Sequence, residues 1–367
     1  MWSYLKYLRY LFLKKYPAEI TFFITAKCNF RCVHCFNWQN IANAIPKNEL
    51  TITEIEKVTL TIPHFLRLSL SGGEPFLRDD LIQICQSFYK NCQVKFITIP
   101  TNGSLTEKII KDTEQILKTC PKLFLNIGLS LDNLGAERDI VVGRKNTFES
   151  LIKTARGLKD LQKKYNNLGL GVITTQISQN EHKLEEIYQF ALNTLNIDNF
   201  GFNIARTMNF GSKVTAMADL DIYKKFTKKL IQEKKSSRFN FPLARFFVVK
   251  RNLIFERVLK TYQTKKYQSA CFSGRLRVVI NEKGDVYPCE TFQFCSHKGS
   301  FLMGNLKDYG LNFKNLFFSS SAQKIKNDIK KTKCFCAHEC DMETNILFNI
   351  KFLPRILWEA MKINLKK

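Results

Sequence analysis

Three cysteines near the start of the chain have the spacing of a metal-binding loop. Cys28, Cys32 and Cys35 form the pattern CxxxCxxC directly after an apolar run, EITFFITAK. Thiolates are soft ligands that select iron–sulfur clusters, zinc or copper(I). A closed structural site takes four protein ligands, whereas a reactive site keeps one coordination position open. Three thiolates on one loop therefore indicate a [4Fe–4S] cluster with one iron left for a substrate, with a zinc loop as the alternative.

A second group of thiols lies towards the C-terminus. Cys271 and Cys289 frame the pattern CX12GX4C, and the stretch KCFCAHEC adds Cys334, Cys336 and Cys340. Between the first two, NEKGDVYPC is typical of a β-hairpin that turns at its glycine. Four thiolates suit an iron–sulfur cluster, and they suit zinc as well. Because the chain shows no secretory signal, we expect metal binding here and not disulfides.

Polar loops follow three apolar runs of the chain. They are Ser71-Gly72-Gly73-Glu74-Pro75, then Thr101-Asn102-Gly103, and then Ser130-Leu131-Asp132-Asn133. Adjacent glycines let a backbone approach a ligand closely, and the N–H and C=O groups of such a turn pair with a polar zwitterion. The last loop ends in asparagine, which tolerates a left-handed backbone. We expect these loops to bind a ligand beside the first three cysteines.

The elements that must position these loops alternate between two patterns. Apolar stretches with strand character are expected at Ile20–Thr25, Leu66–Ser71, Lys95–Thr101, Leu123–Leu131, Leu168–Ile177 and Phe200–Arg206. Amphipathic stretches with helix character are expected at Thr53–Thr61, Asp79–Tyr89, Ser104–Thr119, Thr147–Tyr165 and Glu181–Leu195. We expect Thr53 and Glu56 to form a capping box at the first of these helices. Six such units predict a parallel sheet with helices outside it.

This order predicts an α/β fold, a partial (β/α)6 barrel of the TIM type with a small cysteine-rich C-terminal extension. Functional groups of such a barrel lie on the loops after the carboxyl ends of the strands, which is where the first three cysteines and the polar loops fall. We expect five segments: an amphipathic helix at 1–17, the barrel at 18–210, a helical connector at 211–265, the extension at 266–345 and a basic apolar tail at 346–367.

The motifs resemble those of the radical S-adenosylmethionine (SAM) superfamily. Its signature is CxxxCxxC with an aromatic residue before the last cysteine, and His34 takes that position here. The resemblance implies that Cys28, Cys32 and Cys35 hold a [4Fe–4S] cluster whose free iron chelates the amino and carboxylate groups of SAM. One electron then splits SAM into methionine and a 5′-deoxyadenosyl radical, which abstracts hydrogen from a substrate.

The resemblance also implies which residues contact SAM. They would be the members of the GGEP, TNG and SxD loops, and a polar residue at the end of the sixth strand: Gly72, Gly73, Glu74, Pro75, Asn102, Ser130, Asp132 and Arg206. The stretch ERDIVVGRKNTFES resembles a run of the peptide-modifying branch, which it matches at Asp139, Gly143 and Arg144. Arg138 stands where that pattern has histidine, which puts a role for this position in doubt.

The C-terminal cysteines resemble the SPASM or twitch extension of radical SAM enzymes, which carries auxiliary [4Fe–4S] clusters. A full SPASM extension uses seven cysteines for two clusters, whereas this chain shows a shortened pattern, with Cys295 as an additional cysteine. The resemblance implies one auxiliary [4Fe–4S] cluster, with zinc as the rival. Its ligands would be Cys271, Cys289 and Cys340, with Cys334 or Cys336 as the fourth.

Composition indicates anionic partners. The chain of 367 residues has 57 Lys and Arg against 32 Asp and Glu, a formal charge of +25. This charge suits an acidic flavodoxin or ferredoxin as electron donor, or an anionic membrane surface beside the basic apolar ends. Compositional drift of an AT-rich genome explains it equally well. We see no nucleic-acid-binding motif and no run long enough to span a membrane, so we expect a cytoplasmic protein that binds no nucleic acid, with peripheral membrane contact as a further possibility.

We therefore expect a radical SAM enzyme that acts in peptide or natural-product maturation. A lipid-linked or sugar substrate is the alternative, because both ends of the chain are apolar and basic. A non-catalytic iron–sulfur or zinc protein is the alternative of another class, and the GGEP and TNG loops argue against it. Cys85, Cys92 and Cys120 lack ligand spacing, so we expect them in the core.

Overall fold

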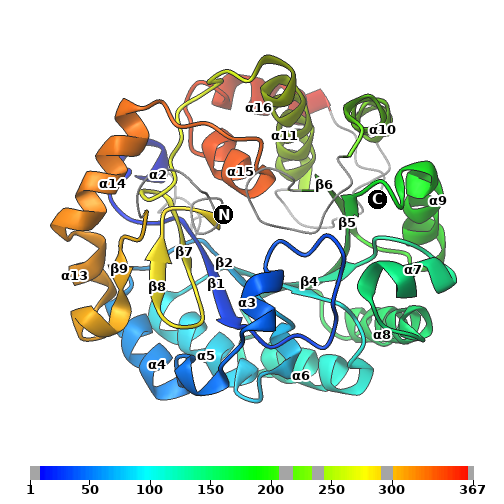
Figure 1. The fold of residues 1–367 in the computed structure, drawn as a ribbon, viewed down its shortest axis with the longest axis horizontal. Helices are drawn as coiled ribbons and strands as arrows, with labels where there is room; N and C mark the ends of the chain where they lie inside the picture. The colour runs from blue at the N-terminus through cyan, green and yellow to red at the C-terminus, as the bar shows by residue number, and fades with distance from the viewer. Residues whose placement is uncertain (1–8, 206–217, 234–243, 291–300, 363–367) are drawn as a thin grey trace.

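Six parallel strands form the sheet that positions the candidate site. The computed structural model describes residues 9–205, 218–233, 244–290 and 301–362. The strands are β1 Glu19–Thr25, β2 Arg67–Gly72, β3 Phe96–Thr101, β4 Phe124–Ser130, β5 Leu168–Gln176 and β6 Asn199–Ile204. Each pairs with its sequence neighbour in parallel. The predicted (β/α)6 barrel is confirmed, and the strand boundaries agree to within two residues (Figure 1).

Amphipathic helices follow the strands and cover the outside of the sheet (Figure 1). They are α4 Ile52–Thr61, α5 Leu81–Cys92, α6 Thr106–Thr119, α7 Gly135–Val142, α8 Thr147–Gln162 and α9 Leu184–Gln189. The expected capping box on α4 is wrong by two residues, because the stretch TITEIE carries the same spacing twice. Thr51 Oγ1 accepts from the backbone N–H of Glu54 at 3.3 Å, and the Glu54 carboxylate accepts from the N–H of Thr51 at 2.8 Å.

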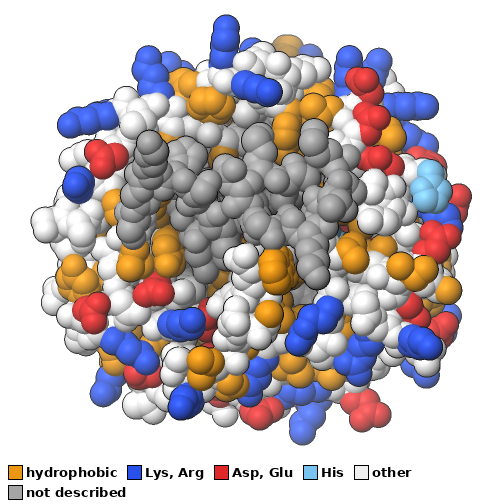
Figure 2. Space-filling model, in the orientation of Figure 1, with side chains coloured by type: hydrophobic (Ala, Val, Ile, Leu, Met, Phe, Trp, Pro, Cys, Tyr) orange, Lys and Arg blue, Asp and Glu red, His pale blue; other side chains and the backbone are white. Residues whose placement is uncertain are grey.

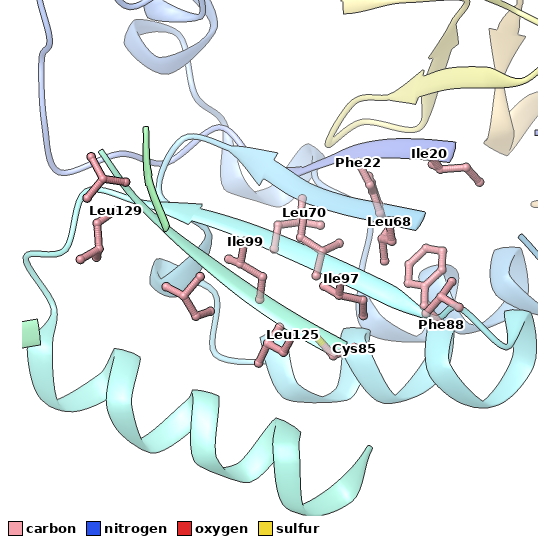
Figure 3. Close-up of a cluster of buried hydrophobic side chains, with 14 of the residues drawn as sticks. Ile20, Phe22, Leu68, Leu70, Cys85, Phe88, Ile97, Ile99, Leu125 and Leu129 are labelled. Carbon is pink, nitrogen blue, oxygen red and sulfur yellow. The ribbon is translucent and has the colours of Figure 1, made fainter. Parts of the chain in front are cut away.

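The core lies between the sheet and these helices. Most residues of one strand register are apolar and buried. Figure 3 shows a cluster of these side chains with Cys85 and Phe88 of α5: Ile20, Phe22, Leu68, Leu70, Ile97, Ile99, Leu125 and Leu129. Cys85, Cys92 and Cys120 are fully buried, as expected. Residues of the other register, which face the inside of the barrel, are mostly small or polar. Strand alternation thus separates the packed outer core from the face of the sheet that lines the cavity.

The C-terminal extension continues the same sheet. β7 Arg277–Ile280 pairs with β1 in parallel, and β8 Asp285–Tyr287 and β9 Gly304–Asn305 follow in antiparallel order. The described strands therefore have the order β6-β5-β4-β3-β2-β1-β7-β8-β9. The expected hairpin turns at Gly284, whose φ of +93° favours glycine.

Further helices fill the side of the barrel between β6 and β7 (Figure 1). α10 Leu220–Gln232 and α11 Ala244–Thr264 come from the expected connector, and α11 packs against α15 Glu339–Leu347 and α16 Leu353–Lys362. α13 Phe313–Phe317 and α14 Ser320–Lys331 lie beside the hairpin, and short helices α2 Arg9–Phe12 and α3 Trp38–Ala42 flank β1 in sequence. Residues 1–8 of the expected N-terminal helix lie outside the described residues. In the part that is described, every helix is too short or too polar to cross a membrane.

Candidate cluster and cofactor site

The cysteine triplet lies on the loop between β1 and α3 (blue in Figure 1). The thiols of Cys28, Cys32 and Cys35 are partly buried and lie near enough to interact electrostatically. Burial raises the pKa of Cys32 well above its usual range, and the neighbouring thiols raise it further. Thiols grouped in this way stay protonated when no cation is present, and a bound metal cluster would stabilise their thiolate forms. The residues present therefore fit a [4Fe–4S] cluster with three thiolate ligands.

The end of α7 holds this loop in place. The backbone N–H of Arg31 donates to Val142 O and that of Val33 to Val141 O, both at 3.0 Å. Gly143 has φ +67°, and a Cβ there would lie 3.0 Å from Arg31 O. Arg144 donates to the carbonyl of Asn29 at 3.1 Å. These contacts show what the GR pair does in this chain, which the sequence resemblance left open.

The GGEP loop packs directly against the chain that enters the triplet. The N–H of Gly73 donates to Thr25 O and that of Glu74 to Lys27 O, both at 2.7 Å. A Cβ on Gly72 would lie 2.1 Å from Thr25 O, and one on Gly73 would lie 1.9 Å from Lys27 O. The glycines thus admit another stretch of protein backbone, which differs from the expectation that they make room for a ligand.

The carboxylate of Glu74 is committed to the neighbouring loop. Its side chain is 1 % exposed and accepts from Thr101 Oγ1 and the N–H of Asn102, both at 2.8 Å, and from the N–H of Phe76 at 3.2 Å. Burial raises the pKa of Glu74 to about 7, against the effect of these donors. Glu74 therefore joins the loops after β2 and β3 instead of presenting its carboxylate to a ligand.

Asn102 and Asp132 also connect loops. Asn102 Nδ2 donates to Asn29 Oδ1 at 2.7 Å, which ties the TNG loop to the cysteine loop. Asp132 accepts from the N–H of Thr175 at 2.7 Å, and its other oxygen lies 3.3 Å from Nε2 of His34. Ser130 lines the barrel cavity at the end of β4. Arg206 lies outside the described residues.

A cavity of about 480 Å³ fills the interior of the barrel. It reaches from His34 in the cysteine loop to Cys340 in the C-terminal group. Its strand wall mixes large apolar residues, such as Phe96, Phe124 and Ile173, with many small or polar ones: Thr21, Ser69, Ser71, Thr98, Asn126, Gly128, Ser130 and Thr175. α11 adds larger side chains on the side between β6 and β7: Phe247, Lys250, Arg251, Ile254 and Phe255. The cavity thus has room for a small ligand or part of a larger one beside the cysteine loop.

Largely buried charges lie where β1, β2 and β7 begin. Glu19 is 3.0 Å from Arg67, and Glu343 of α15 pairs with both Arg67 and Lys250. Burial opposes ionisation of Glu343, but the two cations hold its pKa well below the usual range. Sequence reasoning missed this network, because its members are far apart in the chain. The only local signal is a charged residue at the first position of each strand.

The C-terminal thiols gather beside this network. Cys334 shares a hydrogen bond with Cys271 and interacts electrostatically with Cys289 and Cys336. Cys340 lies near Glu290 and His338. The Cys340 sulfur, a carboxylate oxygen of Glu290 and a ring nitrogen of His338 all lie within 4.8 Å of one another. The structure therefore brings all five expected ligands into one region of the molecule. Cys295 lies outside the described residues.

Two non-cysteine groups stand beside these thiols. His338 Nδ1 lies 2.6 Å from Asp341 Oδ2, which orients the ring. Glu290 lies 2.9 Å from Arg277 and 3.4 Å from His338 Nε2. Sequence reasoning did not single out either Glu290 or His338, although each lies within two residues of an expected ligand.

Comparison with known families decides what these loops belong to. The model of the Radical SAM superfamily matches residues 22–191, and that of SPASM, an iron–sulfur cluster-binding domain, matches residues 271–341. The chain belongs to the radical SAM superfamily. Its radical SAM domain binds a [4Fe–4S] cluster and SAM. Its SPASM domain, which contains the C-terminal thiols, binds auxiliary iron–sulfur clusters.

Individual relatives of this radical SAM protein include peptide-related proteins. The subtilosin biosynthesis protein AlbA of Bacillus subtilis is 24 % identical over 316 residues, which are 84 % of this chain and 61 % of AlbA. SuiB of Streptococcus suis, solved with its precursor peptide SuiA, has a TM-score of 0.61 at 17 % identity, over 88 % of this chain and 70 % of that one. The structure of anSMEcpe with bound AdoMet has a TM-score of 0.59 at 16 % identity, over 95 % and 96 %.

Proposed function

We propose that this protein cleaves SAM reductively and abstracts hydrogen from a substrate held in the barrel cavity. The cavity carries the proposal, because its wall runs from His34 of the cysteine loop to Cys340 of the auxiliary group. Cys28, Cys32 and Cys35 would hold the [4Fe–4S] cluster, which would supply the electron that splits SAM into methionine and a 5′-deoxyadenosyl radical. The chain's own residues position the cofactor, surround the substrate and exclude water.

The residues divide into those that bind and those that position. Cys28, Cys32 and Cys35 would hold the SAM-binding cluster. The backbone of the GGEP loop, Asn102 and Ser130 would face SAM. Glu74 and Asp132 would act as positioning residues, because their carboxylates accept from neighbouring loops.

The auxiliary site would hold one [4Fe–4S] cluster. Its ligands would come from Cys271, Cys289, Cys334, Cys336 and Cys340, one more thiol than a cluster needs. Cys340 lines the cavity, and the thiols of this group are buried or partly buried, which supports an electron acceptor for the oxidised product. Zinc remains the rival occupant, since four thiolates bind it well.

A peptide is the proposed substrate class. AlbA is by name a bacteriocin biosynthesis protein, and SuiB was solved with a precursor peptide. A strand wall with many small residues leaves room for a substrate side chain to enter the barrel. A lipid-linked or sugar substrate is the second candidate, favoured by the exposed apolar face of α16. That face carries Leu357, Trp358 and Met361, and it also supports peripheral membrane contact.

The proposed electron donor is an acidic flavodoxin or ferredoxin. Four exposed basic side chains surround the cysteine loop: Lys27, Arg31, Arg144 and Lys145. On the face shown in Figure 2, Lys and Arg are also spread widely around the rim and mixed with Asp and Glu. The local group at the loop therefore supports donor docking better than the overall charge does.

The test is anaerobic reconstitution followed by reduction with dithionite in the presence of SAM. The proposal expects 5′-deoxyadenosine from the wild-type chain and none from Cys28→Ala. About eight iron atoms per chain would support two cubane clusters, whereas about four with one zinc would assign zinc to the auxiliary site. Intact SAM with a fully loaded and reduced cluster would overturn the proposed activity.

A further inference from the structure

Arg138 of α7 is a fully buried cation whose donors are only partly paired within the part of the chain that the structure describes. Its side chain is 0 % exposed. Nη2 donates to Asn102 O at 2.8 Å and to Ser130 O at 3.3 Å, at the ends of β3 and β4. Within the described residues, Nε and Nη1 have no hydrogen-bond partner. Burying such donors is costly, so an anionic group is expected to meet this guanidinium in the loaded protein.

The surroundings of Arg138 contain three groups that can carry negative charge: Asp132, Cys32 and Asp139. Asp139 accepts from the N–H and the hydroxyl of Thr147 and so caps α8. Asp132 is engaged by Thr175 and His34. Of the three groups, this leaves Cys32 of the cysteine triplet as the anion that Arg138 can stabilise.

The apolar setting makes the charge of Arg138 effective. The guanidinium carbon lies 5.7 Å from the centre of the Phe30 ring, which is itself buried within the cysteine loop. Phe30 packs with Val141, Val142, Cys28 and Cys32. Arg138 therefore lies against the apolar cluster on which two of the thiols also pack. Charges interact more strongly in such a medium than at the surface.

We propose that Arg138 sets the reduction potential of the cluster ligated by Cys32, by stabilising the negative charge that reduction adds. The inference rests on the proposed assignment of Cys28, Cys32 and Cys35 as ligands. One electron from an external donor reduces the cluster, and no proton or bond changes at Arg138. Charge, hydrogen bonding to sulfur and solvent exposure set such potentials. Arginine keeps its charge at any working pH, whereas histidine, which the resembled pattern has here, does not.

The test compares Arg138→Gln with Arg138→Lys in the full, anaerobically reconstituted chain. Midpoint potentials are measured by EPR at poised potentials without SAM. We expect R138Q to lower the ratio of reduced to oxidised cluster at least tenfold at a fixed potential, which equals 59 mV for one electron. R138K keeps the charge and should retain most of the wild-type potential.

Arg31→Gln is the matched control. Arg31 also interacts electrostatically with a cysteine of the triplet, Cys28, but its side chain is exposed. Water and salt screen such a charge, so R31Q should shift the potential much less than R138Q does.

Several outcomes would overturn the inference. An unchanged potential in R138Q would do so, and so would a loss of SAM affinity alone, which would assign the guanidinium to the SAM carboxylate. If R138Q takes up no cluster, R138H is measured at about pH 8, where histidine is mostly neutral, and an unchanged potential there is equally decisive. Failure of the wild type to cleave SAM would instead reject the proposed function. The two results can be told apart, because the midpoint potentials are measured without SAM.

Discussion

The backbone N–H of Asn102 donates to the Glu74 carboxylate at 2.8 Å and so joins the loops after β3 and β2. Both loops belong to the proposed SAM site. The buried Glu74 carboxylate helps to fix their relative position, because it accepts hydrogen bonds from the neighbouring loop. Glutamine has the same shape but replaces one acceptor oxygen with a donor. It cannot accept from Thr101 and Asn102 at once without leaving a buried group unpaired.

Glu74→Gln should therefore lower the free energy of unfolding by about 1–3 kcal/mol and weaken SAM binding. Urea unfolding of cluster-free protein and SAM binding to loaded protein are the measurements. Glu107→Gln is the control, because Glu107 is exposed on α6 and should stay within about 0.5 kcal/mol of the wild type. Equal effects of the two substitutions would contradict the role given to Glu74.

The pH dependence of stability offers a second view of Glu74. Its pKa in the folded protein is about 7, above the value near 4.3 expected in the unfolded chain. A raised folded-state pKa gives stability that is complete below about pH 4 and is lost as the pH rises towards 7. We expect this loss in cluster-free wild type and its absence in Glu74→Gln, measured by urea unfolding between about pH 4.5 and 7.5. Parallel curves for the two proteins would refute it.

Gly73→Ala tests the contact between the GGEP loop and the cysteine loop. Its Cβ would lie 1.9 Å from Lys27 O, so one of the two backbones must move. We expect iron binding by the triplet to fall sharply, measured as iron per chain after reconstitution. Gly201→Ala is the control, since its nearest neighbour would lie at an ordinary 3.5 Å. Wild-type iron content in Gly73→Ala would show that the loop tolerates the shift.

Glu343→Gln tests the buried charges at the start of the strands. It removes the partner of Arg67 and Lys250 and should cost about 3–5 kcal/mol of stability. Because its pKa is lowered in the folded state, its contribution is present above about pH 4.3 and is lost as the pH falls. Denaturant unfolding at several pH values measures both effects. Glu359→Gln, which removes the partly exposed partner of Arg355, should change little.

Substitution of single cysteines separates ligands from core residues. Cys271→Ala should remove about four iron atoms per chain, or the zinc if that metal is bound, whereas Cys85→Ala should keep the metal and lose only stability. Cys85 is fully buried in the apolar cluster that also contains Phe88. Metal analysis after reconstitution decides. Loss of metal in Cys85→Ala, with none in Cys271→Ala, would reverse the assignment.

The barrel was predictable because its signals are local. Apolar runs end in glycine or polar residues, as at Gly72 and Ser130, so strand ends can be located from the sequence to within two residues. The capping box at α4 was misplaced because Thr51 and Thr53 are each followed by glutamate three residues later. A propensity rule cannot choose between two equal matches.

The roles within the site were less predictable, because they depend on distant partners. Glu74 and Asp132 lie in recognisable motifs, yet their carboxylates bind Asn102 and Thr175. Arg138 looked like a departure from the resembled pattern, and only its burial makes it a functional candidate. The pairing of Glu343 with Arg67 spans most of the chain, and no sequence period reports it.

The parallel pairing of β7 with β1 has a consequence for producing parts of this protein. Without residues 277–280, β1 would expose its backbone N–H and C=O groups along one side. A bare strand of that kind recruits strands from other molecules. A fragment cut at residue 265 should therefore precipitate or self-associate even with its triplet intact, because the segment that houses the second set of thiols also covers the free edge of β1.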